Sequence, residues 1–274
     1  MNSMRRLASD YASLRRILTT GDFVALLMAT LTNGSAVLRT GRLTSVDYTM
    51  SRNLSIRFHG SKIAIPLADI DRELANANDN PTFGNIREMC GRDCYLDHLR
   101  LSPPVGVVFD LGANRGMFSL LALKALGAER VVGVEPQAKY EPVMQMLLAA
   151  NNISPSRSVR YNRFIASKAD EQRDPVRNVS IDTICREQGV DRIGMMKVDV
   201  EGFEKNIFAE TDWLDRVDNI AMEVHPQMVG DLSLIPRALE SHGFRYITTD
   251  QPGVPCEINQ AMFLAASRTG ALIS

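Results

Sequence analysis

Residues 107–116 read VVFDLGANRG, and this stretch decides the fold. An apolar run enters Asp110, and Gly112 and Gly116 then frame a turn that leads into a helical stretch over 115–127. Glycines in such a turn allow the backbone to come close to a ligand that a side chain would block. A buried strand, a glycine turn and a helix predict the start of a doubly wound α/β domain.

The sequence after this stretch keeps alternating between short apolar runs and helical patterns. Strands are predicted at 105–110, 131–135, 159–164, 193–198, 220–224, 244–248 and 261–265, with helices at 115–127, 138–151, 182–188 and 232–242. Strands that alternate with helices are typical of a largely parallel sheet covered on both faces. Residues 103–274 are therefore predicted to form one such domain.

Residues 1–102 have a different pattern. Helical spacing is predicted over 4–18 and again to about residue 31, followed by a small antiparallel sheet over 36–67 with a hairpin at His59-Gly60-Ser61. A loop over 76–81 and a helix over 83–100 lead to Pro103-Pro104, which marks the boundary. We expect this N-terminal α+β extension to act as a lid, a dimerisation element or a substrate element.

Composition excludes several classes of protein. The 31 basic and 32 acidic residues nearly cancel, so no nucleic-acid partner is expected. The four cysteines are spread out and do not resemble a disulfide framework. The longest apolar run, Phe23–Leu31, is too short to span a bilayer, so neither a signal peptide nor stable membrane insertion is expected. The sequence predicts a cytoplasmic protein with a small-molecule partner, and it leaves a homo-oligomer open.

Acidic residues stand at or near the ends of four predicted strands: Asp110, Glu135, Asp199 and Glu223. Ligands of open α/β sheets bind outside the carboxyl ends of the strands, so these acids should line one rim. Asn114 replaces the second glycine of the dinucleotide motif, and Asp110 suits an amino group better than a pyrophosphate. Glu135 is placed to accept hydrogen bonds from ribose hydroxyls. A ribose without phosphate and an amino acid moiety together describe S-adenosylmethionine.

The chain resembles the FkbM-type methyltransferases through FDLGANRGMFSL, VVGVEPQ, SIDTICREQGVDRIGMMKVDVEGFE and AMEVHP, within residues 105–226. The segment REMCGRDCYL before them matches more loosely. The resemblance implies a class I methyltransferase (Rossmann-like) fold that uses S-adenosylmethionine for O-methylation, typically of a sugar or natural product. It also implies that Asp199 faces the transfer site and that the cofactor is bound by Asp110, Gly112, Asn114, Gly116 and Glu135, with Ala166 and Ser167 at the adenine.

A hydroxyl acceptor needs help to lose its proton, and two hypotheses remain open. His225 could be the general base, because histidine titrates nearest neutral pH. Alternatively, Asp199 and Glu223 could bind Mg²⁺, because hard cations prefer carboxylate oxygens. Asp199, Glu223 and His225 are thus the predicted catalytic residues, and Asp199 and Glu223 the alternative metal ligands.

Two other functions remain as alternatives. The domain could bind S-adenosylmethionine without catalysis, although such a module has no need of Asp199. It could also be a nucleotide-sugar oxidoreductase, although Asp110 and Asn114 disfavour the pyrophosphate site which that activity requires. Elsewhere, Trp213 is interpreted as a packing residue at a helix end, and Arg157, Arg160 and Arg163 as solvated edge residues.

Overall fold

The computed structural model describes residues 3–75, 77, 79–251 and 253–273. The chain divides into two compact units. The first contains residues 1–94 and 139–155, and the second contains residues 95–138 and 156–274. This division by compactness differs from the sequence-based boundary at residue 102, because residues 139–155 join the N-terminal segment.

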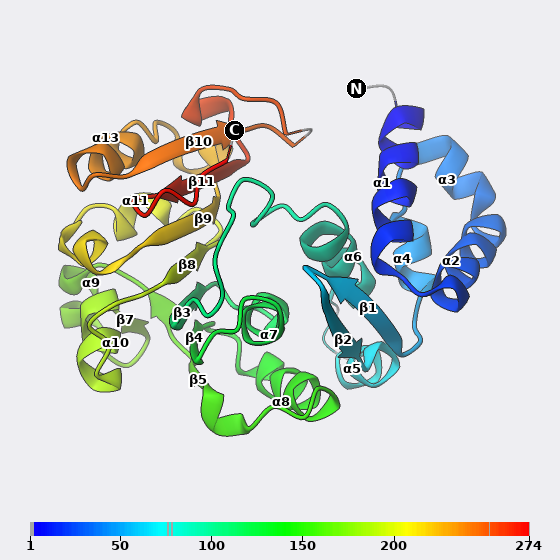
Figure 1. Ribbon diagram of the computed structural model, residues 1–274, viewed down its shortest axis with the longest axis horizontal. Coiled ribbons are helices and arrows are strands. Elements are labelled where there is room, and N and C mark those ends of the chain that lie inside the picture. Colours follow the sequence, from blue (N-terminus) through cyan, green and yellow to red (C-terminus); the bar gives the residue numbers. More distant parts are fainter. Residues whose placement is uncertain (1–2, 76, 78, 252, 274) are drawn as a thin grey trace. The chain divides into compact units, whose positions relative to one another are not determined.

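The first unit is mostly helical (Figure 1). Its elements are α1 (Ser3–Ile17), α2 (Thr20–Thr32), α3 (Gly34–Thr40), α4 (Thr44–Thr49), β1 (Leu54–Phe58), β2 (Ser61–Ile65), α5 (Leu67–Glu73), α6 (Thr82–Ile86), a π-helical turn (Arg87–Gly91) and α8 (Glu141–Ala150). The predicted hairpin is confirmed, since β1 and β2 pair antiparallel around His59 and Gly60.

Two predictions for this unit are wrong. Residues 36–44 are not strand: α3 ends at Thr40, residues 41–43 form a bend, and Thr44 begins α4. Val37 and Leu43 are buried within the helical group, so tertiary packing outweighs the strand preference of β-branched residues. The helix expected over 83–100 ends at Gly91. The predicted loop over 76–81 includes residues 76 and 78, which lie outside the described residues.

The second unit contains a seven-stranded sheet in the order β10-β11-β9-β8-β3-β4-β5 (Figure 1). Its strands are β3 (Val107–Leu111), β4 (Arg130–Val134), β5 (Ser158–Tyr161), β8 (Met195–Val198), β9 (Asn219–Glu223), β10 (Arg245–Thr249) and β11 (Phe263–Ser267). The five strands from β5 to β9 in this order are parallel to their neighbours, whereas β11 is antiparallel to both β9 and β10.

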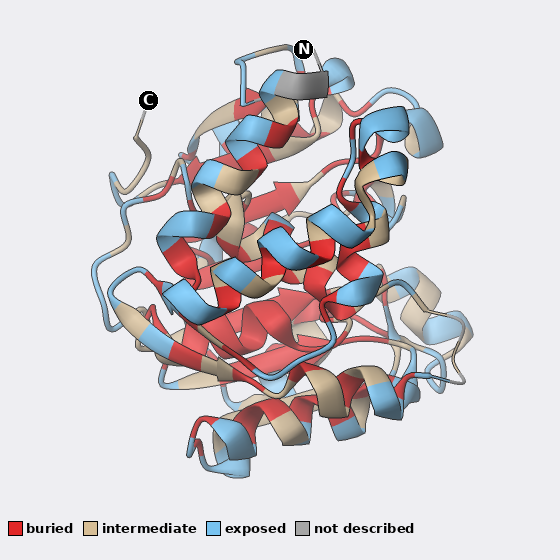
Figure 2. Ribbon diagram, turned by 90° about the vertical axis from the view of Figure 1, so that its right-hand side faces the viewer, coloured by how far each residue is buried: buried red, intermediate tan, exposed pale blue. Residues whose placement is uncertain are grey.

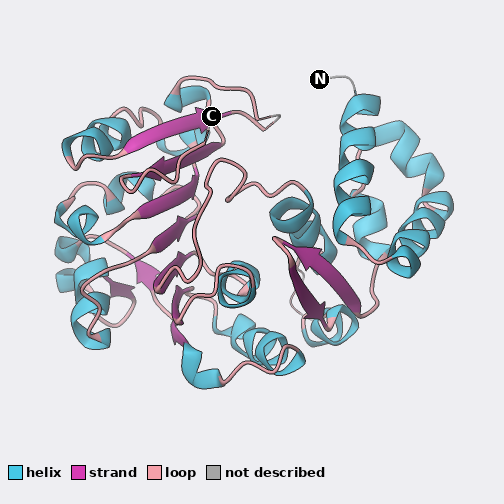
Figure 3. Ribbon diagram, in the orientation of Figure 1, coloured by secondary structure: helices cyan, strands magenta, loops and turns pink. Residues whose placement is uncertain are grey.

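Helices lie along the sheet of the second unit (Figure 3). They are α7 (Met117–Lys124), α9 (Lys168–Arg173), α10 (Ile181–Gln188), α11 (Glu204–Ile207), α12 (Pro226–Val229) and α13 (Leu234–Ser241). Phe109, Met196 and Ile220 of the strands share one core with Ile184 of α10 and Ile235 of α13. The predicted class, a doubly wound α/β sheet of the class I methyltransferase type with an N-terminal α+β extension, is confirmed.

Some details of this unit differ from the sequence analysis. The third strand ends at Tyr161 rather than at residue 164, and Phe164–Ile165 forms β6, which pairs with β7 (Asn178–Val179) in a separate small sheet. The sequence analysis missed α9, a polar helix whose Ser167 cap accepts a hydrogen bond from the Asp170 N–H. Trp213 is buried as predicted, although it lies in a 3₁₀ turn, Asp212–Arg216.

Candidate active site

The topological switch point of the sheet lies between β3 and β8. From β3 the chain moves outward through β4 to β5, and it then returns to β8 on the other side of β3. Ligands of doubly wound folds bind outside the carboxyl ends of the strands at this point. The two loops are in contact here, because the Asp199 N–H donates to the Leu111 carbonyl at 3.0 Å. The site is therefore built from the loops that follow β3 and β8.

The loop after β3 depends on glycine at its first position. Gly112 has φ +75°, and a Cβ on it would lie 1.7 Å from the carbonyl oxygen of Asp199. Gly116, with φ +81°, begins α7, and Asn114 has φ +45° between them. Only glycine adopts the Gly112 conformation at this distance from another backbone segment without displacing it. The glycine turn predicted from the sequence is thus also the contact between the β3 and β8 loops.

Glu135 lies directly after β4 and joins the next loop to the first. Its Oε2 accepts from the Asn114 N–H at 2.9 Å, and its Oε1 accepts from the Gln137 N–H at 2.9 Å. The residue is only 5% exposed. A carboxylate oxygen can accept more than one hydrogen bond, so Glu135 retains capacity for ligand hydroxyls.

Arg160 of β5 also contacts the glycine loop. Its guanidinium donates to the Asn114 carbonyl, and Arg157 donates to the carbonyls of Glu129 and Ala128. The edge position of these two residues is confirmed, since β5 is an edge strand, but both side chains are half-buried and bind backbone carbonyls. A period-two pattern identifies which side of a strand a residue occupies, but it does not show that a carbonyl lies within reach of a long side chain.

Asp110 is completely buried beneath the loop. Ser119 of α7 donates to its Oδ2 at 2.6 Å, and the ammonium of Lys197 lies 3.5 Å from its Oδ1. The predicted direct contact between Asp110 and the cofactor stays a prediction.

Lys197 was missed by the sequence analysis and is a central charge of the site. Its Nζ donates to the Gly112 carbonyl at 2.7 Å and lies 3.3 Å from Oδ2 of Asp199. Burial alone lowers the pKa of Lys197, but Asp199 and Asp110 outweigh it and raise the pKa above its usual value. The ammonium therefore stays charged and compensates two buried or half-buried acids. A lysine inside the apolar run MMKVDV was the available signal.

Two of the predicted rim acids are brought together by a tyrosine. The hydroxyl of Tyr95 lies 3.0 Å from Oδ2 of Asp199 and 3.3 Å from Oε2 of Glu223. The Lys197 ammonium also lies 5.5 Å from the centre of the Tyr95 ring. Tyr95 is part of the loosely matching segment REMCGRDCYL, and its contacts with the rim acids indicate why an aromatic hydroxyl stands there.

His225 follows β9 and is held by a buried carboxylate. Its Nδ1 lies 2.5 Å from Oε1 of Glu204 at the start of α11. Glu204 is completely buried. The hydrogen bond to Glu204, together with the charges of Glu204, Glu223 and Asp199, raises the pKa of His225 to about 9 although burial opposes it.

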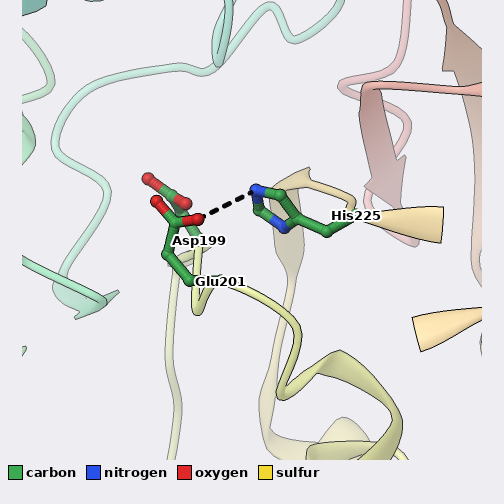
Figure 4. A group of neighbouring side chains, drawn as sticks. All are labelled: Asp199, Glu201 and His225. Carbon is green, nitrogen blue, oxygen red and sulfur yellow. Dashed lines mark ion pairs between the residues drawn. The ribbon is translucent and has the colours of Figure 1, made fainter. Parts of the chain in front are cut away.

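The other ring nitrogen of His225 faces acidic side chains. Nε2 lies 3.6 Å from Oε2 of Glu201 and 3.9 Å from Oε1 of Glu223. Ligand atoms of Asp199, Glu201 and His225 all lie within 4.8 Å of one another (Figure 4). These three residues could hold a metal ion, a set that shares only Asp199 with the predicted pair Asp199 and Glu223.

The two residues predicted at the adenine lie after β6. The Ala166 N–H donates to the Val179 carbonyl, and Ser167 caps α9. Both line a small cavity of about 10 Å³, room for roughly one water molecule. Their role toward the cofactor stays a prediction.

Known proteins that are similar to this chain are methyltransferases. The family model described as "Methyltransferase FkbM domain" matches residues 110–246. The 31-O-demethyl-FK506 methyltransferase FkbM of Streptomyces tacrolimicus is 27% identical over 250 residues, which cover 72% of this chain and 94% of that protein.

Similar solved structures include the ribosomal protein L11 methylase of Lactobacillus delbrueckii subsp. bulgaricus, with 17% identity and TM-score 0.37 over 59% of this chain and 69% of that chain. The precorrin-6y C5,15-methyltransferase of Geobacter metallireducens GS-15 has 15% identity and TM-score 0.34 over 59% of this chain and 80% of that chain. The matched family region contains the glycine turn, Glu135, Lys197, Asp199, Glu204 and His225. The chain belongs to the FkbM methyltransferase family.

Proposed function

We propose that this protein transfers the methyl group of S-adenosylmethionine to a hydroxyl of a small acceptor, such as a sugar or another natural product. The observation that carries this proposal is the arrangement of Glu135 and the glycine loop at the switch point of the sheet. A carboxylate hydrogen-bonded to the loop N–H of Asn114 favours a ribose with free hydroxyls. Asp110 at the end of β3 and Asn114 at the second glycine position disfavour a pyrophosphate, which supports the methyltransferase function over the nucleotide-sugar oxidoreductase.

The residues present fit this cofactor. The loop over 112–116 places backbone groups near the carboxyl end of β3. The carboxylate of Glu135 can still accept hydrogen bonds from the two hydroxyls of a ribose. When bound, S-adenosylmethionine would supply an electrophilic methyl carbon and a neutral sulfide leaving group. The remaining task of the chain is to orient the acceptor hydroxyl and to remove its proton.

The His225–Glu204 pair supports general-base catalysis. Glu204 occupies Nδ1, so the ring is held in one orientation with Nε2 directed toward the rim. As the acceptor oxygen forms its bond to the methyl carbon and the carbon–sulfur bond breaks, Nε2 would take the hydroxyl proton. Because the pKa of His225 is raised to about 9, the neutral ring that can accept this proton becomes the major form only near that pH.

A metal-assisted reaction is the second candidate, favoured by the proximity of Asp199, Glu201 and His225. A ligand set with an imidazole suits Mn²⁺ or Zn²⁺ better than the Mg²⁺ predicted from the sequence. The ammonium of Lys197, 3.3 Å from Asp199, would repel any dication bound there. We therefore favour the general base over the metal.

Cofactor binding is tested first by isothermal titration with S-adenosylmethionine. We expect micromolar affinity for the wild-type protein and at least tenfold weaker binding to Glu135→Gln. Glu129→Gln, an exposed acid before β4, is the matched control and should bind as the wild type does. Absence of wild-type binding, or unchanged binding to Glu135→Gln, would contradict the proposal.

Catalysis is tested by transfer of a radiolabelled methyl group to a panel of hydroxylated small molecules. We expect His225→Ala to lower turnover by roughly 10²-fold or more while cofactor binding persists. Activity that survives exhaustive EDTA treatment would eliminate the metal-assisted route. Tight cofactor binding without transfer to any acceptor would instead favour the non-catalytic module.

A further inference from the structure

Helix α2 of the first unit has an outer face without charge. Its exposed apolar residues Val24, Leu27, Met28 and Leu31 follow the i, i+3, i+4, i+7 spacing of one helix face. Leu31 is 75% exposed, and Leu38 in the next helix, α3, is 79% exposed. The remaining exposed residues of α2 are Thr20, Gly21 and Thr32. Figure 2 shows exposed residues along the outer faces of the helices of this unit.

The exposed charges of residues 3–68 have one sign. Among the described residues 3–68 the only acids are Asp10, Asp22 and Asp47, and all three are buried. Asp10 is paired with Arg92 and Asp47 with Arg87, so their charges are compensated inside the unit. The exposed charged residues of this segment are all basic: Arg5, Arg15, Arg16, Arg39, Arg42, Arg52, Arg57 and Lys62.

Several of these arginines lie next to α2 and α3. The guanidinium of Arg15 is 5.5 Å from the centre of the Phe23 ring, and Arg52 lies 3.6 Å from Asp22 in the first turn of α2. Arg39 lies in the last turn of α3 and directly follows Leu38. The apolar face of α2 and the exposed arginines of the neighbouring segments together offer an anionic membrane an apolar surface and positive charge.

We propose that helices α2 and α3 dock this protein on an anionic membrane surface, with the apolar face in the headgroup region and the arginines on the lipid phosphates. In the described parts of the chain no single helix has both the length and the composition needed to cross a bilayer, although α2 and α3 together do. These two helices are bent by 80° relative to each other, which suits docking on the surface.

The exposed charges and the apolar face favour a membrane over a second copy of the chain and over a nucleic acid. A second copy of the chain in a symmetric dimer would bring two basic segments together, which is unfavourable. A nucleic acid would satisfy the arginines but would leave Val24, Leu27, Met28 and Leu31 in water. Of these three occupants, the anionic membrane surface is the one that matches both the charge and the apolar face.

Vesicle co-sedimentation of the full chain tests the proposal. We expect binding to phosphatidylcholine vesicles that contain 30% phosphatidylglycerol, none to pure phosphatidylcholine, and weaker binding in 0.5 M NaCl. Met28→Glu/Leu31→Glu should bind at least tenfold more weakly than wild type, and Arg39→Gln/Arg42→Gln should lose roughly tenfold or more.

Matched pairs in the second unit control for nonspecific effects. Val176→Glu/Val254→Glu changes two similarly exposed apolar residues, and Arg173→Gln/Arg245→Gln removes two exposed arginines. Both control pairs should bind vesicles as the wild type does. The proposal is overturned by absence of sedimentation with the anionic vesicles, by equal binding to the neutral vesicles, or by equal losses in the controls. A dimer in analytical ultracentrifugation that Met28→Glu/Leu31→Glu dissociates, or DNA binding at the same arginines without vesicle binding, would also overturn it.

Discussion

Nδ1 of His225 lies 2.5 Å from Oε1 of Glu204, and that carboxylate is completely buried. The pair connects the start of α11 with the end of β9, so the orientation of the imidazole is set from behind the site. Carboxylates of Glu201 and Glu223 lie near the opposite nitrogen, Nε2. Acidic side chains on both sides of the ring therefore favour the protonated imidazole.

The titration of His225 follows from this contact. We expect NMR to give a pKa of about 9 in the wild-type protein. Glu204→Gln should move the pKa down toward 6.5, because it removes the hydrogen-bonded charge that contributes most to the shift. A His225 signal that titrates identically in both proteins would contradict the role given to Glu204.

The same group should make the free energy of unfolding depend on pH. Because the folded pKa is above the unfolded value of 6.5, the stabilisation is fully present below pH 6.5 and is lost as pH rises through about 9. The shift corresponds to at most about 3 kcal/mol. Urea unfolding at pH 6 and pH 9.5 should therefore show a larger fall in the wild type than in His225→Gln. Parallel falls in both proteins would assign the pH dependence to other groups.

Lys197→Met should destabilise the protein by roughly 3 kcal/mol, because it leaves Asp110 buried without its counter-charge. Lys197→Met/Asp110→Asn should recover part of that loss in urea unfolding. This recovery distinguishes charge compensation from loss of packing, since the double variant keeps Met at position 197 and removes only the unpaired charge of Asp110. If the second substitution destabilises further, the pairing of Lys197 with Asp110 is not what holds the lysine there.

Gly112→Ala should abolish cofactor binding or folding, since the new methyl group would lie 1.7 Å from the Asp199 carbonyl. Gly189→Ala is the matched control, because Gly189 also has positive φ (+60°) but has open space around its Cβ position. The control should lose only about 1 kcal/mol of unfolding free energy and should keep its affinity for S-adenosylmethionine. Circular dichroism with isothermal titration measures both effects, and equal affinities in the two variants would contradict the steric argument.

The sheet of the second unit could be predicted from the sequence because its strands are short, apolar and separated by glycine turns. The rim acids could be found in the same way, since strand ends in a parallel sheet share one edge. Lys197 could not be placed by this reasoning. Its ammonium is satisfied by the Gly112 carbonyl and by two carboxylates that are distant in sequence, and a hydropathy pattern carries no information about such partners.

The first unit was less predictable for a related reason. The segment from Val37 to Thr44 contains apolar and threonine residues that suit a strand, yet the burial of Val37 and Leu43 within a helical group decides the structure. Tyr95 likewise stands in the segment over 83–100 that was expected to be helix, and the helical pattern did not show its contacts with Asp199 and Glu223. Contacts that depend on tertiary structure could not be predicted from local sequence patterns.

The position of β11 has a consequence for how the protein is made. It is the last strand along the chain, yet it lies between β9 and β10 inside the sheet. During synthesis on a ribosome, β9 and β10 emerge first and have no partner at the positions that β11 later occupies. The sheet can therefore be completed only when residues 263–267 have left the exit tunnel, which leaves two strand edges open to mispairing until then.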